Sequence, residues 1–581
     1  MFVRVKKSGH HQYLQIVSNK RVDGKVRQSV IGTLGRLDRL QETGELDGLL
    51  ASCARFAEQS AVLSAQRQGT LSPAKTDRIG PALVFDRLWH QLGLPRIFGQ
   101  LLADRKFEFD VQRAIFLTVL HRLFDPGSDR AAERWRHHYV IDGVESLQLH
   151  HLYRAMAWLG EELPDEQQGG RTPFAPRCNK DLVEEALFEE RRDLFSEIDL
   201  VFFDTTSIYF EGQGGETIGQ HGNSKDHRPD LKQMVVGLVI DGEGRPLCCE
   251  LWPGNTTDVK TLIPIVDRLR ERFDIRSLCI VADRGMISKE TIESLQAADD
   301  DIRFLLGARM RAVKEVREKV LGRGGRYQIV RGPRQRKKDP APLKVKEVWV
   351  KDRRYIVCHN EEEARKEKEA REAIVASLTE QLRKGPVSLV GNKGYRKFLT
   401  ARKGGALRID EQKIKEDAGY DGKWVLQTDT DLSPAECALK YKELLLVEQL
   451  FRSIKSILET RPIYHQCDQT IRGHVFCSFM ALVLIKELWS RLEQRGWCIE
   501  WEHLRRDLDA LEEITVTTHE KTFVIRSETQ GVAGKAIQAA GIALGSIVRF
   551  VDSAAPPPGR PPTLGGKANC SANATVPIPK S

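Results

Sequence analysis

Two aspartates, distant from each other in the chain, stand in settings where carboxylates often ligate divalent metal ions. Asp204 ends the apolar run 201–203, and Asp283 ends the apolar run 279–282. Because sites in α/β sheets form at the edge where strands end, we expect both carboxylates to lie at such an edge. Asp is also common after strands simply because it favours turns, so the pair of aspartates is more informative than either residue alone.

A third carboxylate is needed if two hard cations are to be held together, one activating the attacking oxygen and the other stabilising the leaving oxygen. Glu448 is the candidate. Tyr441, Glu448 and Lys455 recur every seven residues on a helix expected to run from Pro434 to about Leu458. That spacing places them along one stripe, where Glu448 would face metals and the other two would contact phosphate. The alternative is a solvated helix face.

Short apolar runs and helical patterns around these acids predict a mixed sheet with helices packed on it. Asn255-Thr256-Thr257-Asp258 supplies capping residues for a helix that reaches Leu262, and Ser433 and Glu436 form a capping-box pattern. The predicted strands are 200–203, 234–240, 247–251, 278–282 and 302–306.

Positive charge is concentrated in one stretch of the chain. Residues 309–358 hold seventeen Lys or Arg and five Asp or Glu, a local net charge of +12 in a chain whose total is +9. A basic stretch beside a nearly neutral remainder is typical of a surface that binds a polyanion, and the alternative is a solvated Arg-rich loop. β-like runs and a charged helix over 360–382 mark residues 309–430 as an insertion.

The rest of the chain divides by pattern. Alternating apolar and polar residues predict a small β-element, helical spacing predicts a helical domain with possible DNA-end binding, and a tail dense in Pro, Gly, Ala and Ser predicts disorder. The expected segments are a β-element (1–45), a helical domain (46–195), a catalytic core (196–308 and 431–495), the basic insertion (309–430), a C-terminal region (496–552) and a disordered tail (553–581).

Composition and missing motifs exclude several function classes. Hydrophobic content of 41% with 29% charged residues fits a globular protein, and the longest apolar run, 475–485, is too short for a membrane span. The N-terminus shows no secretion signal, so we expect a cytoplasmic protein without membrane partners. The eleven cysteines include no Cys-x-x-Cys pair, and the cluster His465, Cys467, His474 and Cys477 lacks zinc-finger spacing, so we assign no zinc. No Walker-type loop, His-Glu-x-x-His or Gly-x-Ser-x-Gly is present.

These residues resemble the DDE transposases of the insertion-sequence-four superfamily, of the Tyr-Arg-Glu-Lys signature type. Tyr441, Glu448 and Lys455 fall on the signature's intervals, and Leu444 stands where the family has Arg. The resemblance covers residues 198 to about 490 and includes three further motifs. Within the superfamily, the sequence is similar to the branch related to the insertion sequence numbered sixteen thirty-four. Those motifs are Asp204-Thr205-Thr206, Asp283-Arg284-Gly285-Met286, and Asp421-Gly422 with Thr428.

The resemblance implies an α/β fold: a ribonuclease-H-like catalytic core with the β-rich basic insertion between the second Asp and the Glu, preceded by the small β-element and the helical domain. It also implies a two-metal site of Asp204, Asp283 and Glu448 that uses Mg²⁺, with Mn²⁺ as a substitute. The reaction would be nicking at the transposon end, hairpin formation by the freed 3′-hydroxyl, hairpin opening, and strand transfer. The implied setting is a bacterial, nucleoid-associated homodimer acting on terminal inverted repeats and target DNA.

Several side chains are candidates for contact with DNA. Arg228 and Lys232 lie in a polar stretch that resembles the family's, and the alternative for them is an ordinary polar loop entering a strand. Trp349 and Trp424 could stack on a flipped base, with core packing as the alternative. The expected DNA contacts are Tyr441, Lys455, Arg228, Lys232 and Arg452.

Two other functions fit part of this pattern. A metal-dependent nuclease would use similar carboxylates without the basic insertion, and it would never join DNA ends. A non-catalytic, DNA-binding descendant of a transposase would be expected to have lost one of the three acids, and all three are present.

Overall fold

The computed structural model describes most of the chain between residues 2 and 551. The predicted disordered tail, 553–581, lies outside the described residues. Inside that span the structure leaves out residues 23–24, 44, 47–48, 50–71, 170, 172–174, 193–199, 276–277, 299–301, 337–338, 385–396, 402–406, 457 and 518–521. The chain divides into two compact units, each described by itself. One comprises Met1–Arg78, Ala510–Gln530 and Ala543–Ser581, and the other comprises Ile79–Asp509 and Gly531–Ile542.

The first unit contains two antiparallel sheets. The strands β1 (Phe2–Ser8), β2 (His11–Val22) and β3 (Lys25–Arg36) pair in that order and are followed by α1 (Leu37–Glu42), which confirms the predicted strands near the N-terminus. The second sheet has the order β18-β17-β16-β4. Its strands are β4 (Ser72–Arg78), β16 (Glu512–Thr517), β17 (Thr522–Arg526) and β18 (Val548–Val551). Sequence reasoning missed β4 because its residues, Ser-Pro-Ala-Lys-Thr-Asp-Arg, show no apolar alternation.

The second unit begins with a group of helices. The helix α16 (Asp468–Glu493) contains the long apolar run 475–485, which is buried as expected, and it packs against α3, α5 and α7. No helix in the described part of the chain is both long and apolar enough to cross a membrane. The other helices here are α3 (Gly80–Gln91), α4 (Leu94–Leu101), α5 (Val111–Phe124), α6 (Asp129–Trp135), α7 (Leu149–Leu159), α8 (Asn179–Arg191), α17 (Trp501–Asp509) and α18 (Ala533–Ala539).

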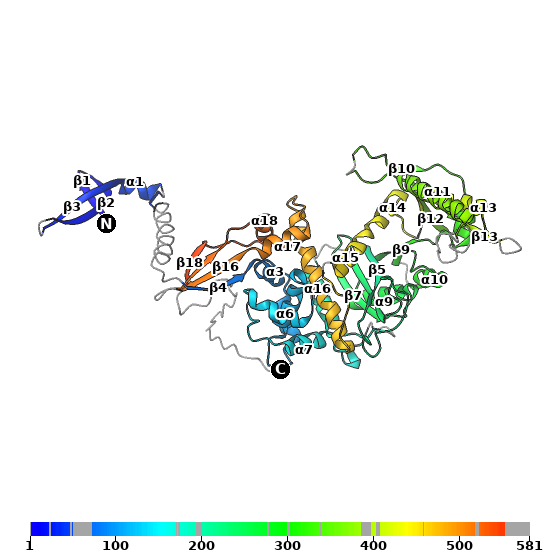
Figure 1. Ribbon diagram of the computed structural model, residues 1–581, viewed down its shortest axis with the longest axis horizontal. Coiled ribbons are helices and arrows are strands. Elements are labelled where there is room, and N and C mark those ends of the chain that lie inside the picture. Colours follow the sequence, from blue (N-terminus) through cyan, green and yellow to red (C-terminus); the bar gives the residue numbers. More distant parts are fainter. Residues whose placement is uncertain are drawn as a thin grey trace, which may run out of the picture. The chain divides into compact units, whose positions relative to one another are not determined.

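The second unit also contains a nine-stranded mixed sheet (Figure 1). Its order is β10-β11-β12-β15-β9-β8-β5-β6-β7; β5, β6 and β7 are antiparallel neighbours, whereas β8 is parallel to both β5 and β9. The strands are β5 (Leu200–Tyr209), β6 (Gln233–Asp241), β7 (Pro246–Pro253), β8 (Leu278–Ala282), β9 (Ile302–Gly307), β10 (Gln328–Arg331), β11 (Leu343–Val350), β12 (Arg353–His359) and β15 (Lys423–Thr428).

The strands of the basic segment extend this sheet. β15 pairs with β9 on one side and with β12 on the other, so the predicted insertion continues the sheet that carries Asp204 and Asp283. The other elements between β7 and α14 are α9 (Leu262–Phe273), α10 (Lys289–Ala298), α11 (Glu361–Lys384), β13 (Leu399–Ala401), β14 (Leu407–Ile409) and α13 (Glu411–Ala418). The helix α11 confirms the charged helix expected over 360–382.

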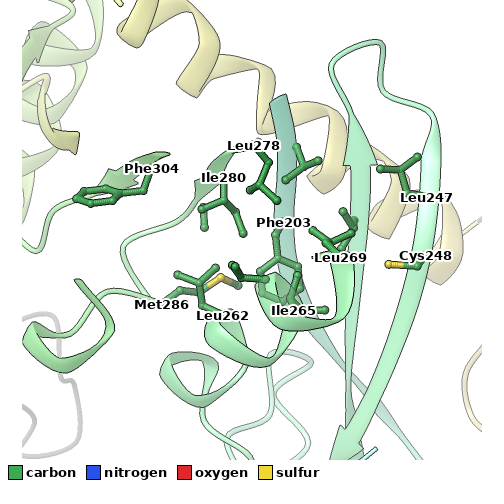
Figure 2. Close-up of a cluster of buried hydrophobic side chains, with 14 of the residues drawn as sticks. Phe203, Leu247, Cys248, Leu262, Ile265, Leu269, Leu278, Ile280, Met286 and Phe304 are labelled. Carbon is green, nitrogen blue, oxygen red and sulfur yellow. The ribbon is translucent and has the colours of Figure 1, made fainter. Parts of the chain in front are cut away.

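A buried apolar cluster packs against the parts of β5 and β8 next to the two aspartates. Phe203, the residue before Asp204, packs with Leu262 and Ile265 of α9, and Ile280 of β8 and Met286 belong to the same cluster (Figure 2). Phe203 and Ile280 are completely buried. Burial of such side chains stabilises the fold by about 1.5–3 kcal/mol each. The backbone on both sides of the acids is therefore fixed by packing.

Candidate active site

Asp204 and Asp283 occupy neighbouring positions on adjacent parallel strands. Phe203 lies opposite Ala282 in the β5–β8 register, so the next residue on each side is an aspartate. Asp283 directly follows the end of β8, as predicted. Asp204 does not end its strand: β5 continues to Tyr209, because residues 205–207 are buried and pair with β6. The expectation that both acids follow strand ends was therefore wrong for Asp204.

The setting of Asp204 favours its neutral form. Burial raises the pKa of its carboxyl from 3.8 to about 6, and the nearby carboxylates of Asp283 and Asp258 add to that rise. The Lys225 ammonium and the Thr205 backbone N–H, which donates to Asp204 Oδ1 at 2.7 Å, act in the opposite direction. A divalent cation relieves this kind of crowding, and carboxylate oxygens are the ligands that Mg²⁺ prefers. The donor set at this position therefore fits a hard metal ion.

We expect Asp204→Asn to stabilise the metal-free protein at alkaline pH. The folded-state pKa of about 6 lies above the unfolded value of 3.8, so the free energy of unfolding falls as pH rises through that window. Asn does not ionise, and the variant should gain about 2–3 kcal/mol over the wild type above pH 6, a gain absent below about pH 4. Urea unfolding of the variant and the wild type in EDTA, at pH 8 and at about pH 4, measures the gain. Equal stabilities at pH 8 would contradict the description of Asp204.

Tyr441 is held against the second aspartate. Its hydroxyl donates a hydrogen bond to Asp283 Oδ1 at 2.9 Å. Burial, reinforced by Asp283, raises the pKa of Tyr441, so the phenol stays protonated and remains a donor. A Cβ at Gly307 would lie 2.3 Å from the Tyr441 hydroxyl, so only glycine leaves room for this contact. Sequence reasoning missed Gly307, for which a glycine inside a strand pattern was the available signal.

Arg309, the first residue of the basic stretch, braces the loop that follows Asp283. Its guanidinium donates to the Arg284 carbonyl at 2.9 Å and to the Gly285 carbonyl at 2.7 Å. The loop is therefore held both by this guanidinium and by the contact of Tyr441 with Asp283. Sequence reasoning counted Arg309 only as part of the basic charge.

The helix expected to carry all three signature residues is broken. α14 (Pro434–Glu443) begins with the predicted Ser433 capping box, and α15 (Leu445–Ser456) is the next helix (Figure 1). Leu444 lies between the two helices. The Leu444 N–H bonds to the Tyr441 carbonyl, three residues back. Leu444, whose backbone stays in the right-handed helical region, thus divides the predicted helix in two, with Tyr441 on α14 and Glu448 and Lys455 on α15. Within α15, Glu448 and Lys455 remain seven residues apart and share one side of the helix.

Glu448 belongs to no tight cluster of possible metal ligands among the described residues. Glu448 is exposed, and among the described residues its side chain has no recorded hydrogen bond or ion pair. In the part of the chain that the structure describes, the carboxylates of Asp204, Asp283 and Glu448 do not form a group with all ligand atoms within 4.8 Å of one another. The helix α15 packs against β5 and β6, and α14 packs against β8 and β9.

The other residues predicted to contact DNA lie in different surroundings. The Lys455 ammonium is 2.7 Å from Asp226 Oδ1, and burial lowers the pKa of Lys455. Arg228 forms an ion pair with Asp230 at 2.8 Å, Lys232 donates to Gln213 Oε1 at 2.8 Å, and Arg452 is exposed on α15.

Asp258 does not cap the helix that follows it, contrary to the expectation. The N-cap of α9 is Thr261, which makes no side-chain capping bond. The Asp258 carboxylate instead accepts a hydrogen bond from the Thr205 hydroxyl at 2.7 Å and pairs with the Lys225 ammonium at 3.3 Å. Lys225 also donates to the Thr205 carbonyl at 2.7 Å. These contacts were hidden from sequence reasoning because they join three separate segments.

The histidine cluster weighed for zinc has a different composition in the structure. His465 and His474 come together with Asp129, with ligand atoms within 4.8 Å of one another. The Arg122 guanidinium lies 2.8 Å from His474 Nδ1 and takes the lone pair that a metal ion would need. Burial, and next the charge of Arg122, lowers the pKa of His474.

The basic side chains of the stretch 309–358 differ in whether they pair with a carboxylate. Among the described residues Arg326, Arg331 and Arg336 have no recorded ion pair, whereas Arg354 is paired with Glu347 at 2.6 Å. Trp349 is 50% exposed on β11, so core packing does not describe it. Trp424 is partly buried, and the Lys442 ammonium lies 5.4 Å from its ring centroid.

Comparisons with known proteins identify two family matches in this chain. Residues 3–67 match the family described as IS1634 family transposase, N-terminal domain, and residues 195–484 match the Transposase DDE domain. The second match spans Asp204, Asp283 and Glu448. No curated protein matches the chain.

Three solved structures show a distant likeness. The piggyBac transposase synaptic complex with hairpin DNA has 9% identity and a TM-score of 0.37, with 74% of this chain and 79% of that one covered. The Mos1 paired-end complex with the left transposon end has 15% identity and a TM-score of 0.14, with 34% and 61% covered. The Mos1 mariner paired-end complex with Mn has 12% identity and a TM-score of 0.14, with 44% and 76% covered. On the two family matches, the chain belongs to the IS1634-related DDE transposases.

Proposed function

We propose that this protein moves an insertion sequence by metal-dependent cleavage and joining of DNA, through a cut-and-paste, hairpin-type DDE mechanism. One observation supports the proposal more strongly than any other. Asp204 within β5 and Asp283 just after the parallel strand β8 occupy neighbouring positions, with the Tyr441 hydroxyl donating to Asp283 at 2.9 Å. Two adjacent carboxylates on packed strands are a rigid base for metal ligation.

A ribonuclease-H-like core is part of the proposal. The order β7-β6-β5-β8-β9, with two antiparallel pairs followed by two parallel pairs, supports it. In this core the first acid lies on the central strand β5 and the second follows its parallel neighbour β8. Beyond β9 the sheet continues through β15 to the basic strands β12, β11 and β10, which would hold DNA backbone close to the acids.

Glu448 completes the acid set when DNA and metal bind, in our proposal. Its position on the same side of α15 as Lys455, its exposure, and the boundary between α14 and α15 at Leu444 support this step. That boundary lets α15 change direction relative to α14, whose Tyr441 stays on Asp283. A shift of a helix at such a boundary is an ordinary hinge motion.

The chain's residues then have separate roles. Two Mg²⁺ ions, or Mn²⁺ in their place, would supply the activation of the attacking oxygen and the stabilisation of the leaving oxygen. Asp204, Asp283 and Glu448 would hold the ions, and Tyr441 would orient Asp283. Lys455, Arg452, Arg228 and Lys232 would bind backbone phosphates. Water breaks the first strand and releases a 3′-hydroxyl; each later attack by a hydroxyl exchanges one phosphodiester for another.

A nuclease that never joins ends is the second candidate, and a non-catalytic DNA-binding descendant is the third. The retention of all three acids weighs against the descendant. The extension of the sheet by strands rich in arginine, some of them without an ion pair in the described part of the chain, weighs against a simple nuclease. The proposed setting is a homodimer on paired terminal inverted repeats and target DNA, associated with the bacterial nucleoid.

The test is incubation of the purified protein with the DNA that flanks its own gene, a target plasmid and Mg²⁺. The proposal expects nicked ends, hairpin ends and joined products, all absent in EDTA. Cleaved ends without any joined product would identify a nuclease. Bound but uncut DNA would identify the non-catalytic descendant.

A further inference from the structure

Two consecutive residues of the loop between β5 and β6 reach in different directions. Lys225 contacts β5: its backbone N–H donates to the Ser207 hydroxyl at 2.8 Å, and its ammonium donates to the Thr205 carbonyl at 2.7 Å. Asp226 contacts α15 instead: its carboxylate accepts a hydrogen bond from the Lys455 ammonium at 2.7 Å, and it also pairs with Arg461, which follows that helix. One loop thus touches the strand of Asp204 and the helix of Glu448.

The Asp226 end of this link is shielded from water. The side chain of Asp226 is 6% exposed and that of Lys455 is 15% exposed, whereas Arg461 is 27% exposed. A buried carboxylate shared by two cations holds its partners in a defined geometry, since losing it leaves uncompensated charge inside the protein. Screening by salt acts weakly on such a pair.

The Lys225 end is fixed by a second carboxylate. Lys225 pairs with Asp258 at 3.3 Å, and Asp258 also accepts from the Thr205 hydroxyl at 2.7 Å. Thr205 in turn donates its backbone N–H to Asp204 at 2.7 Å. A chain of short polar contacts therefore runs from Asp204 to Lys225, and the next residue begins the contacts to α15.

We propose that Lys225 and Asp226, which we call the 225–226 clasp, are positioning residues that set α15 and its Glu448 relative to Asp204. The inference rests on the proposed function, because it gives the clasp the task of letting the distant acid join the other two. Neither residue touches the reacting atoms in this account. The clasp acts through Thr205 at one end and Lys455 at the other.

A backbone connection that does not involve the clasp makes the inference testable. The Ile463 N–H bonds to the Tyr209 carbonyl at 3.3 Å, and the Glu211 N–H bonds to the Ile463 carbonyl at 3.0 Å. The segment after α15 therefore stays attached to the end of β5 when the clasp is cut. Clasp variants should fold, with α15 less restrained.

The experiment uses the full-length protein with Asp226→Asn and, separately, Lys225→Met. Hydrogen–deuterium exchange of residues 445–456, without DNA or metal, should become about tenfold faster in Asp226→Asn, with β8 unchanged. The Mn²⁺ concentration for half-maximal cleavage should rise about 10-fold or more in both variants, as for other residues that orient metal ligands. Equilibrium binding to the transposon end should not weaken. Lys225→Arg should restore the wild-type metal requirement.

The matched control is Glu243→Gln, which removes an exposed carboxylate paired with Arg245 in the turn between β6 and β7. It should leave both readouts at wild-type values. An unchanged metal requirement in both clasp variants, or unchanged exchange of α15 in Asp226→Asn, overturns the inference. A general loss of stability with wild-type metal requirement also overturns it, because that is what a purely structural ion pair would give.

Failure of the proposed function looks different. If the wild type never cleaves DNA with Mn²⁺, the proposed function is wrong. The hydrogen–deuterium exchange of α15 in Asp226→Asn then decides alone whether the clasp restrains the helix. If the wild type cleaves DNA and the clasp variants behave like it, only the inference about the clasp fails, and the proposed function stands.

Discussion

Asp204→Asn, Asp283→Asn and Glu448→Gln are each expected to abolish Mg²⁺-dependent cleavage of the transposon end while binding to that end survives. Each change replaces an anionic ligand by a neutral amide of nearly the same shape, so the fold is kept and the hold on a hard cation is lost. The cleavage rate should fall by roughly three orders of magnitude or more. Cleavage and gel-shift assays on the same labelled DNA measure the two properties.

Glu443→Gln is the matched control for Glu448→Gln. It removes a carboxylate from the neighbouring helix α14, where Glu443 pairs with Lys440 at 3.3 Å on the surface. Cleavage by the control should stay within about twofold of the wild type, as for most surface substitutions. Cleavage retained by any one of the three acid variants would remove that residue from the metal site.

Binding to DNA should weaken steeply as salt rises. Phosphate contacts release condensed counterions, so six to ten contacts lower the affinity by roughly 10³–10⁵-fold between 50 and 200 mM salt. Arg326, Arg331 and Arg336, whose guanidinium groups form no ion pair among the described residues, are the expected contributors from the basic stretch. The measurement is the slope of log affinity against log salt concentration.

Single substitutions separate the contributors from the structural arginines. Arg326→Gln, Arg331→Gln and Arg336→Gln should each reduce the slope by about 0.9 for every phosphate that the arginine neutralises in the wild type. Arg354→Gln, whose guanidinium is already engaged with Glu347, should leave the slope unchanged. A flat salt response of the wild type would show that the basic stretch is not a DNA surface.

The strands of the core could be predicted because their residues form short, nearly continuous apolar runs. The run 278–282 coincides with β8, and the run 302–306 falls one residue short of β9. The same logic ended the first strand too early at Phe203. Thr205, Thr206 and Ser207 are polar in sequence, yet they are buried in β5 and hydrogen-bonded, which only the pairing with β6 decides.

The site was only partly visible in the sequence because its assembly depends on contacts between distant segments. The spacing of Tyr441, Glu448 and Lys455 assumed an unbroken helix, and the division at Leu444 was not foreseen. The position has no glycine or proline to signal a break. The link between Asp226 and Lys455 joins residues 229 positions apart, and no local pattern signals such a pair.

The domain organisation could also be predicted only in part, because it depends on contacts between distant segments. Charge and strand-like runs marked the basic stretch, but the pairing of β15 with β9 is a tertiary contact that the sequence did not indicate. The four-stranded sheet of the first unit joins β4 to strands more than four hundred residues later, with Ser72 opposite Thr517. Its polar edge strand carried no periodic signal.

Cleavage of the polypeptide by bound iron tests the central claim most directly. Fe²⁺ with ascorbate and peroxide, replacing Mg²⁺ in the complex with transposon-end DNA, cuts the backbone close to the metal ligands. The account predicts DNA-dependent fragments ending near Asp204, Asp283 and Glu448, all suppressed by excess Mg²⁺. Fragments near the two aspartates alone, with the chain intact around Glu448 even when DNA is bound, would contradict it.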